Sequence, residues 1–265
     1  MPPPPTYLAT LNKHERDQFI HFDEGPHIYT VNGEQGYTSV TTWNHEHFAQ
    51  FDSAKIVAGI LRSSKRNDPT YKYYGMTEAE ILASWDKNRD EASSAGTRTH
   101  YNVECFYNGM EVVDDSIEFK FFQRFVADHP HLEAYRTEWC VYYEEIKISG
   151  SIDMVFRDKR SGEFLIYDWK RSKGIEYESY GNRSATTPCI SHLPDTNFWH
   201  YSLQLNVYRK ILQDKYGIQI TGMALVVLHP DNANKSYEVV EVPFLDKEMA
   251  DLWDYRKNQL ASKTA

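Results

Sequence analysis

Three β-type segments lie close together in the middle of the chain, and they constrain the fold more than any other feature. Residues 135–143 are rich in aromatic and β-branched types, residues 147–156 alternate between apolar and polar types, and residues 164–169 are strongly apolar. Consecutive strands with short connections usually lie side by side, so the simplest arrangement is an antiparallel meander.

Helical patterns precede and follow these strands. Thr77 followed by Glu80 is a capping-box signature that begins a helix, and Gly96 indicates either a break in that helix or a close helix approach before a second helix runs to about Tyr107. The other predicted helices cover 52–65, 116–128, 198–216 and 246–260, two later strands cover 223–228 and 237–242, and a small hairpin lies within 17–42. This order predicts a mixed α/β (α+β) fold, in which helices flank a central mixed sheet and an N-terminal helical cap precedes it.

The length of 265 residues fits one large domain. Residues 1–15 are expected to be a flexible Pro-rich tail, and residues 16–265 a single domain. Within that domain we expect a helical front part over about 44–130 and a core over about 131–265. The polar segment 172–197 is long for a connection in a compact domain, so it is expected to be functional or mobile.

Charge and composition exclude some classes of protein. The net charge is -9, so the chain lacks the overall basic charge that marks many nucleic-acid-binding proteins, although a local basic groove stays possible. The 3 cysteines are far apart and do not have the spacing of a zinc site. Neither a run of about 18 apolar residues nor a signal peptide is present, so we expect an intracellular protein with no membrane partner, in the cytoplasm or nucleus or, for a viral protein, in the host cell.

Two acids and a lysine lie inside the apolar central strands. Asp168 and Lys170 alternate along one strand and therefore share a face, with Cα atoms roughly 7 Å apart. A short meander can bring Asp153, from the preceding strand, beside Asp168. Asp-x-Lys alone is more often a solvated turn or strand edge. Carboxylates inside apolar strands are costly unless they are paired or bind a metal, so the second acid favours a functional site.

This set of side chains suits phosphodiester hydrolysis. Carboxylate oxygens are the ligands that Mg²⁺ or Mn²⁺ prefers, and such an ion polarises a phosphate and lowers the pKa of bound water. A neighbouring lysine can orient or deprotonate that water, or screen the phosphate charge. The pattern therefore predicts a metal-dependent nuclease.

Four elements together resemble the PD-(D/E)xK nuclease superfamily, and more narrowly its RecB-like exonuclease branch. They are Gly-Ser-Ile-Asp153, Asp168-Trp169-Lys170, the helical segment from Gly96 through His100 to Glu104, and Gln204-Leu-Asn-Val-Tyr208. They occur in the order of that family and cover about residues 95–230. Tyr37 to Thr42, followed by Phe48 and Phe51, is similar to the front of related nucleases from large DNA viruses and phages.

The resemblance implies a restriction-endonuclease-like core and a role for each matching residue. Asp153 and Asp168 would be acidic metal ligands, His100 and the backbone carbonyl of Trp169 additional ligands, and Lys170 the catalytic lysine. Gln204 and Tyr208 would contact DNA or position the lysine. Some RecB-like relatives hold an iron–sulfur cluster with four cysteines, and 3 scattered cysteines predict that this chain has none.

Several of these assignments have ordinary alternatives. Without the rest of the pattern His100 would be a partly buried histidine, and Glu104, which shares its helix face, is as well explained by a surface charge. Glu138 falls opposite Asp153 if the hairpin turns between Glu145 and Ile146, since 138 + 153 = 145 + 146. Its alternative is an edge-strand charge facing solvent. Tyr208 is otherwise a core residue.

Contacts to the substrate are expected near the long loop and the helical front part. Lys and Arg side chains there could follow phosphates, and Trp199, His200 and Tyr201 could stack on bases of a single strand. For any one of them, scattered solvated charge or core packing is an equally ordinary role. The candidate basic residues are Arg98, Arg171, Lys173 and Arg183.

These features predict a Mg²⁺- or Mn²⁺-dependent deoxyribonuclease. The resemblance implies an exonuclease acting on single-stranded DNA or strand ends in DNA repair or recombination. One alternative is a nucleic-acid-binding module on a nuclease scaffold without turnover, which the intact set of Asp153, Asp168 and Lys170 disfavours. Another is a structural Ca²⁺ protein, which the positive charge of Lys170 disfavours.

Overall fold

A mixed six-stranded sheet is the framework of the larger part of the chain. The computed structural model describes residues 4–264, in which residues up to Ala49 and from Thr99 onward form one unit and Gln50–Arg98 form a smaller one. The strands of the sheet are β3 (Thr38–Ser39), β4 (Leu132–Tyr143), β5 (Ile148–Asp158), β6 (Phe164–Lys170), β7 (Ile220–Val227) and β8 (Glu238–Glu241). The mixed α/β class with a central mixed sheet flanked by helices is confirmed.

The predicted antiparallel meander is confirmed. β4 pairs with β5 and β5 pairs with β6, both antiparallel, whereas β7 lies parallel to β6 and β8 antiparallel to β7. The chain between β4 and β5 turns through the short 3-10 helix η3 (Glu144–Ile146), with Lys147 in the left-handed conformation. The predicted register is therefore also correct: Thr137 pairs with Met154 and Trp139 with Ile152, which places Glu138 opposite Asp153.

One edge of β5 is shared by two strands that leave a gap between them. β4 pairs along the whole of the opposite edge. On the shared edge, β3 pairs in parallel with Ile148–Ser149, and β6 pairs with Met154–Arg157. Within the described chain, residues 150–153 of β5 pair with neither β3 nor β6. The backbone of β5 therefore opens toward a cavity just where Asp153 lies.

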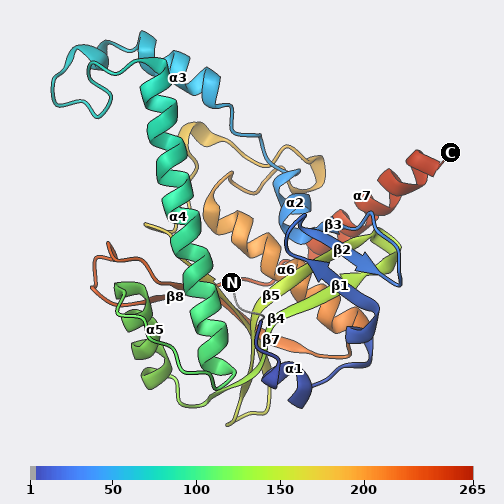
Figure 1. Ribbon diagram of the computed structural model, residues 1–265. Coiled ribbons are helices and arrows are strands. Elements are labelled where there is room, and N and C mark those ends of the chain that lie inside the picture. Colours follow the sequence, from blue (N-terminus) through green and yellow to red (C-terminus); the bar gives the residue numbers. More distant parts are fainter. Residues whose placement is uncertain (1–3, 265) are drawn as a thin grey trace. The chain divides into compact units, whose positions relative to one another are not determined.

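Each face of the sheet buries a different apolar cluster, because side chains alternate along every strand. One cluster joins Ile166 and Leu225 to the helices α6 (Asn197–Lys215) and α7 (Asp246–Thr264). The other joins Trp169 and Val226 to helix α5 (Ile117–Asp128). Figure 1 shows α5 and α6 on opposite sides of the strands. Asp168 alternates with Trp169 and therefore shares the α6 face with Ile166.

The N-terminal segment is more ordered than a flexible tail over residues 1–15. Helix α1 (Tyr7–Leu11) buries Leu8, and the 3-10 helix η1 (Glu15–Phe19) follows it. The prediction of a tail was wrong from Tyr7 onward, because contacts with β4 hold this segment in place, as when Asn12 Nδ2 donates to the carbonyl of Tyr135 at 2.8 Å. Residues 1–3 lie outside the described residues.

The small hairpin and the helix that follows it complete the N-terminal part of the larger unit. β1 (Ile20–Asp23) and β2 (Ile28–Val31) pair antiparallel, which confirms the predicted hairpin. The short helix α2 (Val40–His45) directly follows β3, and the Ser39 hydroxyl caps it by accepting from the backbone N–H of Thr42 at 3.0 Å. No sequence pattern predicted α2 as a helix.

The smaller unit is helical. It contains α3 (Ser53–Arg62), the 3-10 helix η2 (Ser64–Asn67) and the first part of α4 (Glu78–Tyr107). The prediction that Gly96 breaks this helix was wrong, because α4 is continuous over its 30 residues. A single glycine weakens a helix without ending it when the residues around it keep their backbone hydrogen bonds.

The long segment between β6 and α6 contains two short 3-10 helices, η4 (Tyr180–Asn182) and η5 (Pro188–Ile190). None of the helices within residues 4–264 combines the length and the apolar character needed to cross a membrane.

Candidate functional site

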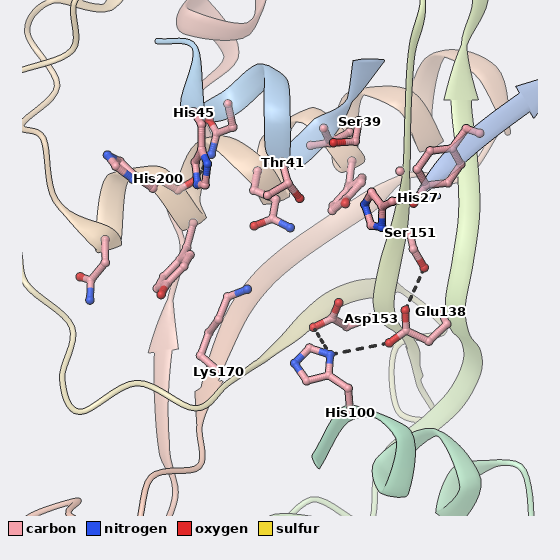
Figure 2. Close-up of a pocket in the computed structure, with 18 residues that line it drawn as sticks. His27, Ser39, Thr41, His45, His100, Glu138, Ser151, Asp153, Lys170 and His200 are labelled. Carbon is pink, nitrogen blue, oxygen red and sulfur yellow. Dashed lines mark hydrogen bonds and ion pairs between the residues drawn. The ribbon is translucent and has the colours of Figure 1, made fainter. Parts of the chain in front are cut away.

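A cavity of about 400 Å³ opens in the larger unit where β5 separates from β6. Figure 2 shows the site with His100, Glu138 and Asp153 at one end, Lys170 beside them, and Ser39, Thr41 and His45 on the opposite side. The residues around the cavity are His27, Tyr29, Ser39, Val40, Thr41, Asn44, His45, His100, Glu138, Gly150, Ser151, Asp153, Lys170, Asn197, His200, Tyr201, Gln204 and Tyr208.

Three metal-ligating side chains converge at the carboxylate end of the cavity. One ligand atom each from His100, Glu138 and Asp153 lies within 4.8 Å of the others. His100 Nδ1 is 3.5 Å from Asp153 Oδ2 and 3.7 Å from Glu138 Oε1. The second oxygen of Glu138 accepts a hydrogen bond from Ser151 Oγ at 2.9 Å, so the carboxylate is held on its far side.

The backbone of Trp169 orients both His100 and Asp153. His100 Nε2 lies 2.8 Å from the carbonyl oxygen of Trp169, which can only accept, so Nε2 carries a proton. The backbone N–H of Trp169 donates to Asp153 Oδ2 at 3.0 Å. With Nε2 engaged, the Nδ1 lone pair of a neutral His100 faces the two carboxylates, which is how a hydrogen-bonded carbonyl prepares a histidine for a metal.

Asp168 and Lys170 form an ion pair beside this cluster. Lys170 Nζ is 2.6 Å from Asp168 Oδ2, and the same ammonium lies 4.6 Å from the centre of the Tyr201 ring. The Asp168 side chain is 3% exposed, so its charge depends on Lys170 for compensation. The structure thus groups Glu138, rather than Asp168, with His100 and Asp153, and Asp168 holds the lysine.

The positive charges near the buried carboxylates do not fully offset the cost of burying them. Burial raises the pKa of Asp168 to about 6, with the charge of Asp153 adding to the effect, and burial also raises the pKa of Asp153. Burial by itself would lower the pKa of His100, but Asp153 and Glu138 outweigh it and raise this pKa to about 9. At neutral pH His100 therefore carries a proton, and the positive charge of the ring stabilises the neighbouring carboxylates of Asp153 and Glu138.

This donor set fits a hard divalent cation. Two carboxylates and one imidazole converge, and a third carboxylate lies next to them in an environment that favours positive charge. Cysteine is not among the three converging side chains, so the set suits Mg²⁺ or Mn²⁺ better than a thiolate-bound zinc or iron–sulfur cluster. Binding of a cation by His100 Nδ1 would release its proton.

Glu104 lies one helical turn from His100 and is 6% exposed. Burial raises its pKa to about 8, and the charges of Glu138 and Glu24 add to the shift. A carboxyl group in this state is largely protonated at neutral pH. The surface-charge alternative for Glu104 is therefore wrong, and its buried position supports a place behind the His100 cluster.

Gln204 and Tyr208 lie on the α6 wall of the cavity, one turn apart. Tyr208 is 3% exposed, and burial raises the pKa of its hydroxyl well above the ordinary value. Its ring packs directly on the backbone of Gly150, because a Cβ added there would be 2.9 Å from both Cε1 and the hydroxyl oxygen of Tyr208. Glycine at position 150 is thus required for the close approach of α6 to β5.

The predicted basic contacts have different surroundings. Arg171 Nε is 2.7 Å from Glu118 Oε1, and this pair is mostly buried, so Arg171 ties β6 to α5. Lys173 and Arg183 are largely exposed, at 3.9 Å from Asp231 and Asp195. Arg98 is an exposed residue of the smaller unit.

The wall opposite the acids comes largely from residues that no sequence motif indicated. His27, Asn44 and His45 belong to the hairpin and α2, and they line the cavity with neutral hydrogen-bonding groups or imidazoles. His200, a predicted stacking residue, packs against Phe48 with ring centres 3.8 Å apart and bonds Asp195 through Nε2 at 3.0 Å. The pattern of residues 37–42, singled out in the sequence, was the one signal that pointed to this region.

No protein-family model matches the chain, and no curated protein matches it. The residues of the site itself are therefore the basis on which a function can be proposed.

Proposed function

We propose that this protein is a Mg²⁺- or Mn²⁺-dependent deoxyribonuclease with a restriction-endonuclease-like core. The observation that carries the proposal is the convergence of His100, Glu138 and Asp153 next to the Asp168–Lys170 pair at the open edge of β5. A structural ion pair would not need three further ligating groups beside it. The order of the motifs supports the RecB-like branch and, by that resemblance, an exonuclease of DNA repair or recombination.

The protein would hold the ion with His100, Glu138 and Asp153, with Asp168 next to them. The carbonyl of Trp169, which the resemblance implied as a ligand, instead accepts from His100 Nε2 on the far side of the ring and so orients this ligand. Such an ion polarises a phosphate and lowers the pKa of bound water. Although burial favours a neutral amine, the charges of Asp168 and Asp153 raise the pKa of Lys170 above its ordinary value. Lys170 therefore stays protonated at neutral pH, where it orients water by donating and stabilises negative charge on phosphate oxygens.

The cavity supports a DNA strand end better than a long duplex surface as the substrate. Lys170 is the one lysine or arginine among the described residues around the cavity, whereas duplex binding normally depends on many phosphate contacts. The ring of Tyr201 lies 4.6 Å from Lys170 Nζ, and the ring of His200 also lines the cavity, so both provide surfaces on which an unpaired base can stack.

Cleavage of labelled DNA tests the proposal. We expect degradation with Mg²⁺ or Mn²⁺ and none with EDTA, and loss of degradation in Asp153→Asn and Lys170→Met with unchanged circular dichroism. Cleavage without metal, or full activity in both variants, would overturn it. Tight, salt-sensitive DNA binding without cleavage in any metal would favour the binding module, and calorimetry showing a preference for Ca²⁺ over Mg²⁺ and Mn²⁺ would favour a structural calcium protein.

A further inference from the structure

β4 carries a backbone irregularity at the residue that completes the metal-ligating cluster. Glu138 has φ 42, in the left-handed region that a side chain with a Cβ seldom occupies. Its neighbours Thr137 and Trp139 pair regularly with β5, whereas Glu138 itself turns its carboxylate toward His100 and Ser151. A conformation of this kind persists when the surrounding structure holds it in place.

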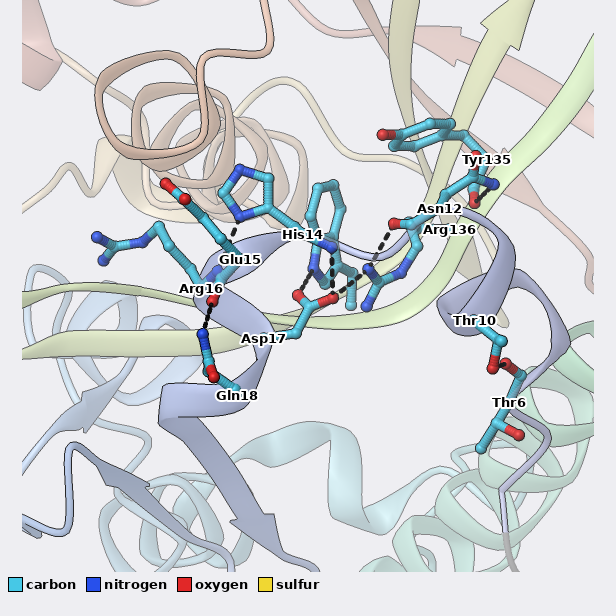
Figure 3. A network of polar contacts seen from close by, with 11 residues as sticks. Thr6, Thr10, Asn12, His14, Glu15, Arg16, Asp17, Gln18, Tyr135 and Arg136 are labelled. Atoms are coloured by element: carbon cyan, nitrogen blue, oxygen red, sulfur yellow. Dashed lines mark hydrogen bonds and ion pairs between the residues drawn. The ribbon is translucent and has the colours of Figure 1, made fainter.

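Asp17 of η1 binds side chains on both sides of Glu138. Its Oδ1 accepts from Trp139 Nε1 at 2.9 Å, and its Oδ2 accepts from Arg136 Nη1 at 2.8 Å. Figure 3 shows the Asp17 carboxylate pointing at Arg136, beside His14. The backbone N–H of His14 donates to Asp17 Oδ2 at 2.9 Å, so the carboxylate is itself held in place.

The two side chains that Asp17 binds are buried and packed together. Trp139 is fully buried, Arg136 is 5% exposed, and the Arg136 guanidinium lies 4.5 Å from the centre of the Trp139 ring. Arg136 Nη1 also donates to the carbonyl of Asn12 at 3.1 Å. Asp17 therefore compensates a buried charge and joins residues 136 and 139 into one unit, with Glu138 between them.

We propose that Asp17 is a positioning residue for the candidate metal centre: by binding Arg136 and Trp139 together, it holds the left-handed backbone at Glu138 that aims this carboxylate at His100. The inference rests on the proposed function, because it assumes that the cluster takes up a divalent cation. Without the negative charge at position 17, Arg136 keeps no carboxylate partner among the described residues. β4 then relaxes toward a regular extended strand at Glu138, and the Glu138 carboxylate leaves the cluster.

Mn²⁺ binding to the full chain, measured by calorimetry and by the electron paramagnetic resonance of free Mn²⁺, tests this role. Asp17→Asn keeps the size of the side chain but removes its charge and one of its two acceptors. Trp139→Phe removes the N–H that donates to Asp17 and keeps an aromatic ring. This variant tests the same role if Asp17→Asn does not fold. We expect each variant to weaken Mn²⁺ binding about tenfold or more, as removal of groups that orient metal ligands typically does.

Arg16→Gln is the matched control. Arg16 precedes Asp17 in η1 and also contacts the end of β4. Its partners are the carbonyl of Tyr142 at 3.3 Å and the Glu144 carboxylate at 2.8 Å, which lie further along the chain than Glu138 and its left-handed backbone. We expect this variant to lower the melting temperature as Asp17→Asn does, while its Mn²⁺ affinity stays within about twofold of the wild type. A drop in affinity that follows melting temperature alone would show a merely structural role for Asp17.

The outcomes separate the two proposals. If the wild type binds Mn²⁺ and Asp17→Asn and Trp139→Phe bind it equally well, the positioning role is wrong and the metal centre stands. If the wild type takes up no Mn²⁺, the metal centre is wrong, and the positioning role falls with it. Weaker binding in Asp17→Asn or Trp139→Phe, but not in Arg16→Gln, supports the positioning role.

Discussion

His100 Nδ1 lies 3.5 Å from Asp153 Oδ2, while Nε2 on the other side of the same ring donates to the carbonyl of Trp169 at 2.8 Å. The imidazole of His100, from helix α4, thus contacts both strand β5, through Asp153, and strand β6, through Trp169. Since Trp169 also donates its backbone N–H to Asp153, a single peptide segment sets the positions of both side chains. The backbone of β6 at Trp169, directly between Asp168 and Lys170, therefore fixes how the His100 and Asp153 side chains are oriented.

Replacing Lys170 by methionine should reduce DNA cleavage by about 10²- to 10⁴-fold, the usual contribution of one positioned acid–base or charge-stabilising group. The side chain keeps a similar length but loses the ammonium that lies 2.6 Å from Asp168. Single-turnover cleavage with Mn²⁺ measures the effect. Lys147→Met, which removes a half-buried lysine paired with Glu34 away from the cavity, is the control and should cleave like the wild type.

Glu138→Gln should weaken Mn²⁺ binding more than Ser151→Ala does. The first change removes a ligating charge, whereas the second removes the 2.9 Å hydrogen bond that orients it, for which a loss of about tenfold is expected. Calorimetric titration of both variants gives the comparison. An unchanged affinity in Glu138→Gln would mean that Glu138 is not a ligand.

Gly150→Ala should destabilise the fold by about 1–3 kcal/mol, because the added methyl group would overlap the ring of Tyr208 at 2.9 Å. Gly96→Ala is the control, since no heavy atom of the described residues lies within 4 Å of a Cβ there, outside the helix's own nearby backbone. In the interior of α4 that change should stabilise by roughly 0.5–1 kcal/mol. Urea unfolding of both variants measures the difference, and equal stabilities would show that Tyr208 moves freely.

Acid should destabilise the protein through His47. This ring is 3% exposed and bonds Thr187 Oγ1 at 2.9 Å, and burial, with the charge of Arg256, lowers its pKa to about 4. In the unfolded chain the pKa is about 6.5, so the unfolded state binds more protons between these values. The stabilisation is fully present above about pH 6.5 and is lost as the pH falls toward 4, by up to about 3 kcal/mol.

The free energy of unfolding of the wild type minus that of His47→Gln, measured by urea unfolding from pH 7 to pH 4, isolates this contribution. The difference should shrink as the pH falls. Glu104 has a raised pKa and therefore acts in the opposite direction over part of this range, but it is present in both proteins and cancels. A difference that does not vary with pH would show that His47 is not held neutral.

The central part of the fold could be predicted because it depends on local signals. β4, β5 and β6 are close in sequence, so their antiparallel pairing followed from the strand patterns. The position of Glu138 opposite Asp153 depended on an assumed turn between Glu145 and Ile146, which the register of β4 and β5 matches. The continuity of α4 through Gly96 could not be predicted from one weak helix former.

The wall of the cavity opposite the acids depends on contacts distant in sequence. α2 reaches the site because β3 pairs with the start of β5, a tertiary contact without a sequence signature, and this contact brings Asn44 and His45 to the cavity. The separate surroundings of Asp168 and Glu138 likewise depend on the left-handed backbone of Glu138, which residue types do not indicate. From the sequence, a short meander could bring Asp153 beside Asp168, and the family resemblance implied Asp168 as a ligand.

Crystals soaked with Mn²⁺ would show whether the site holds an ion, since the anomalous signal locates the ion independently of activity. We predict one strong peak bounded by His100 Nδ1, Glu138 and Asp153, at about 2.0–2.6 Å from each ligand atom. If the density shows no peak among these three side chains, at a Mn²⁺ concentration that supports DNA cleavage, then His100, Glu138 and Asp153 do not form the metal site.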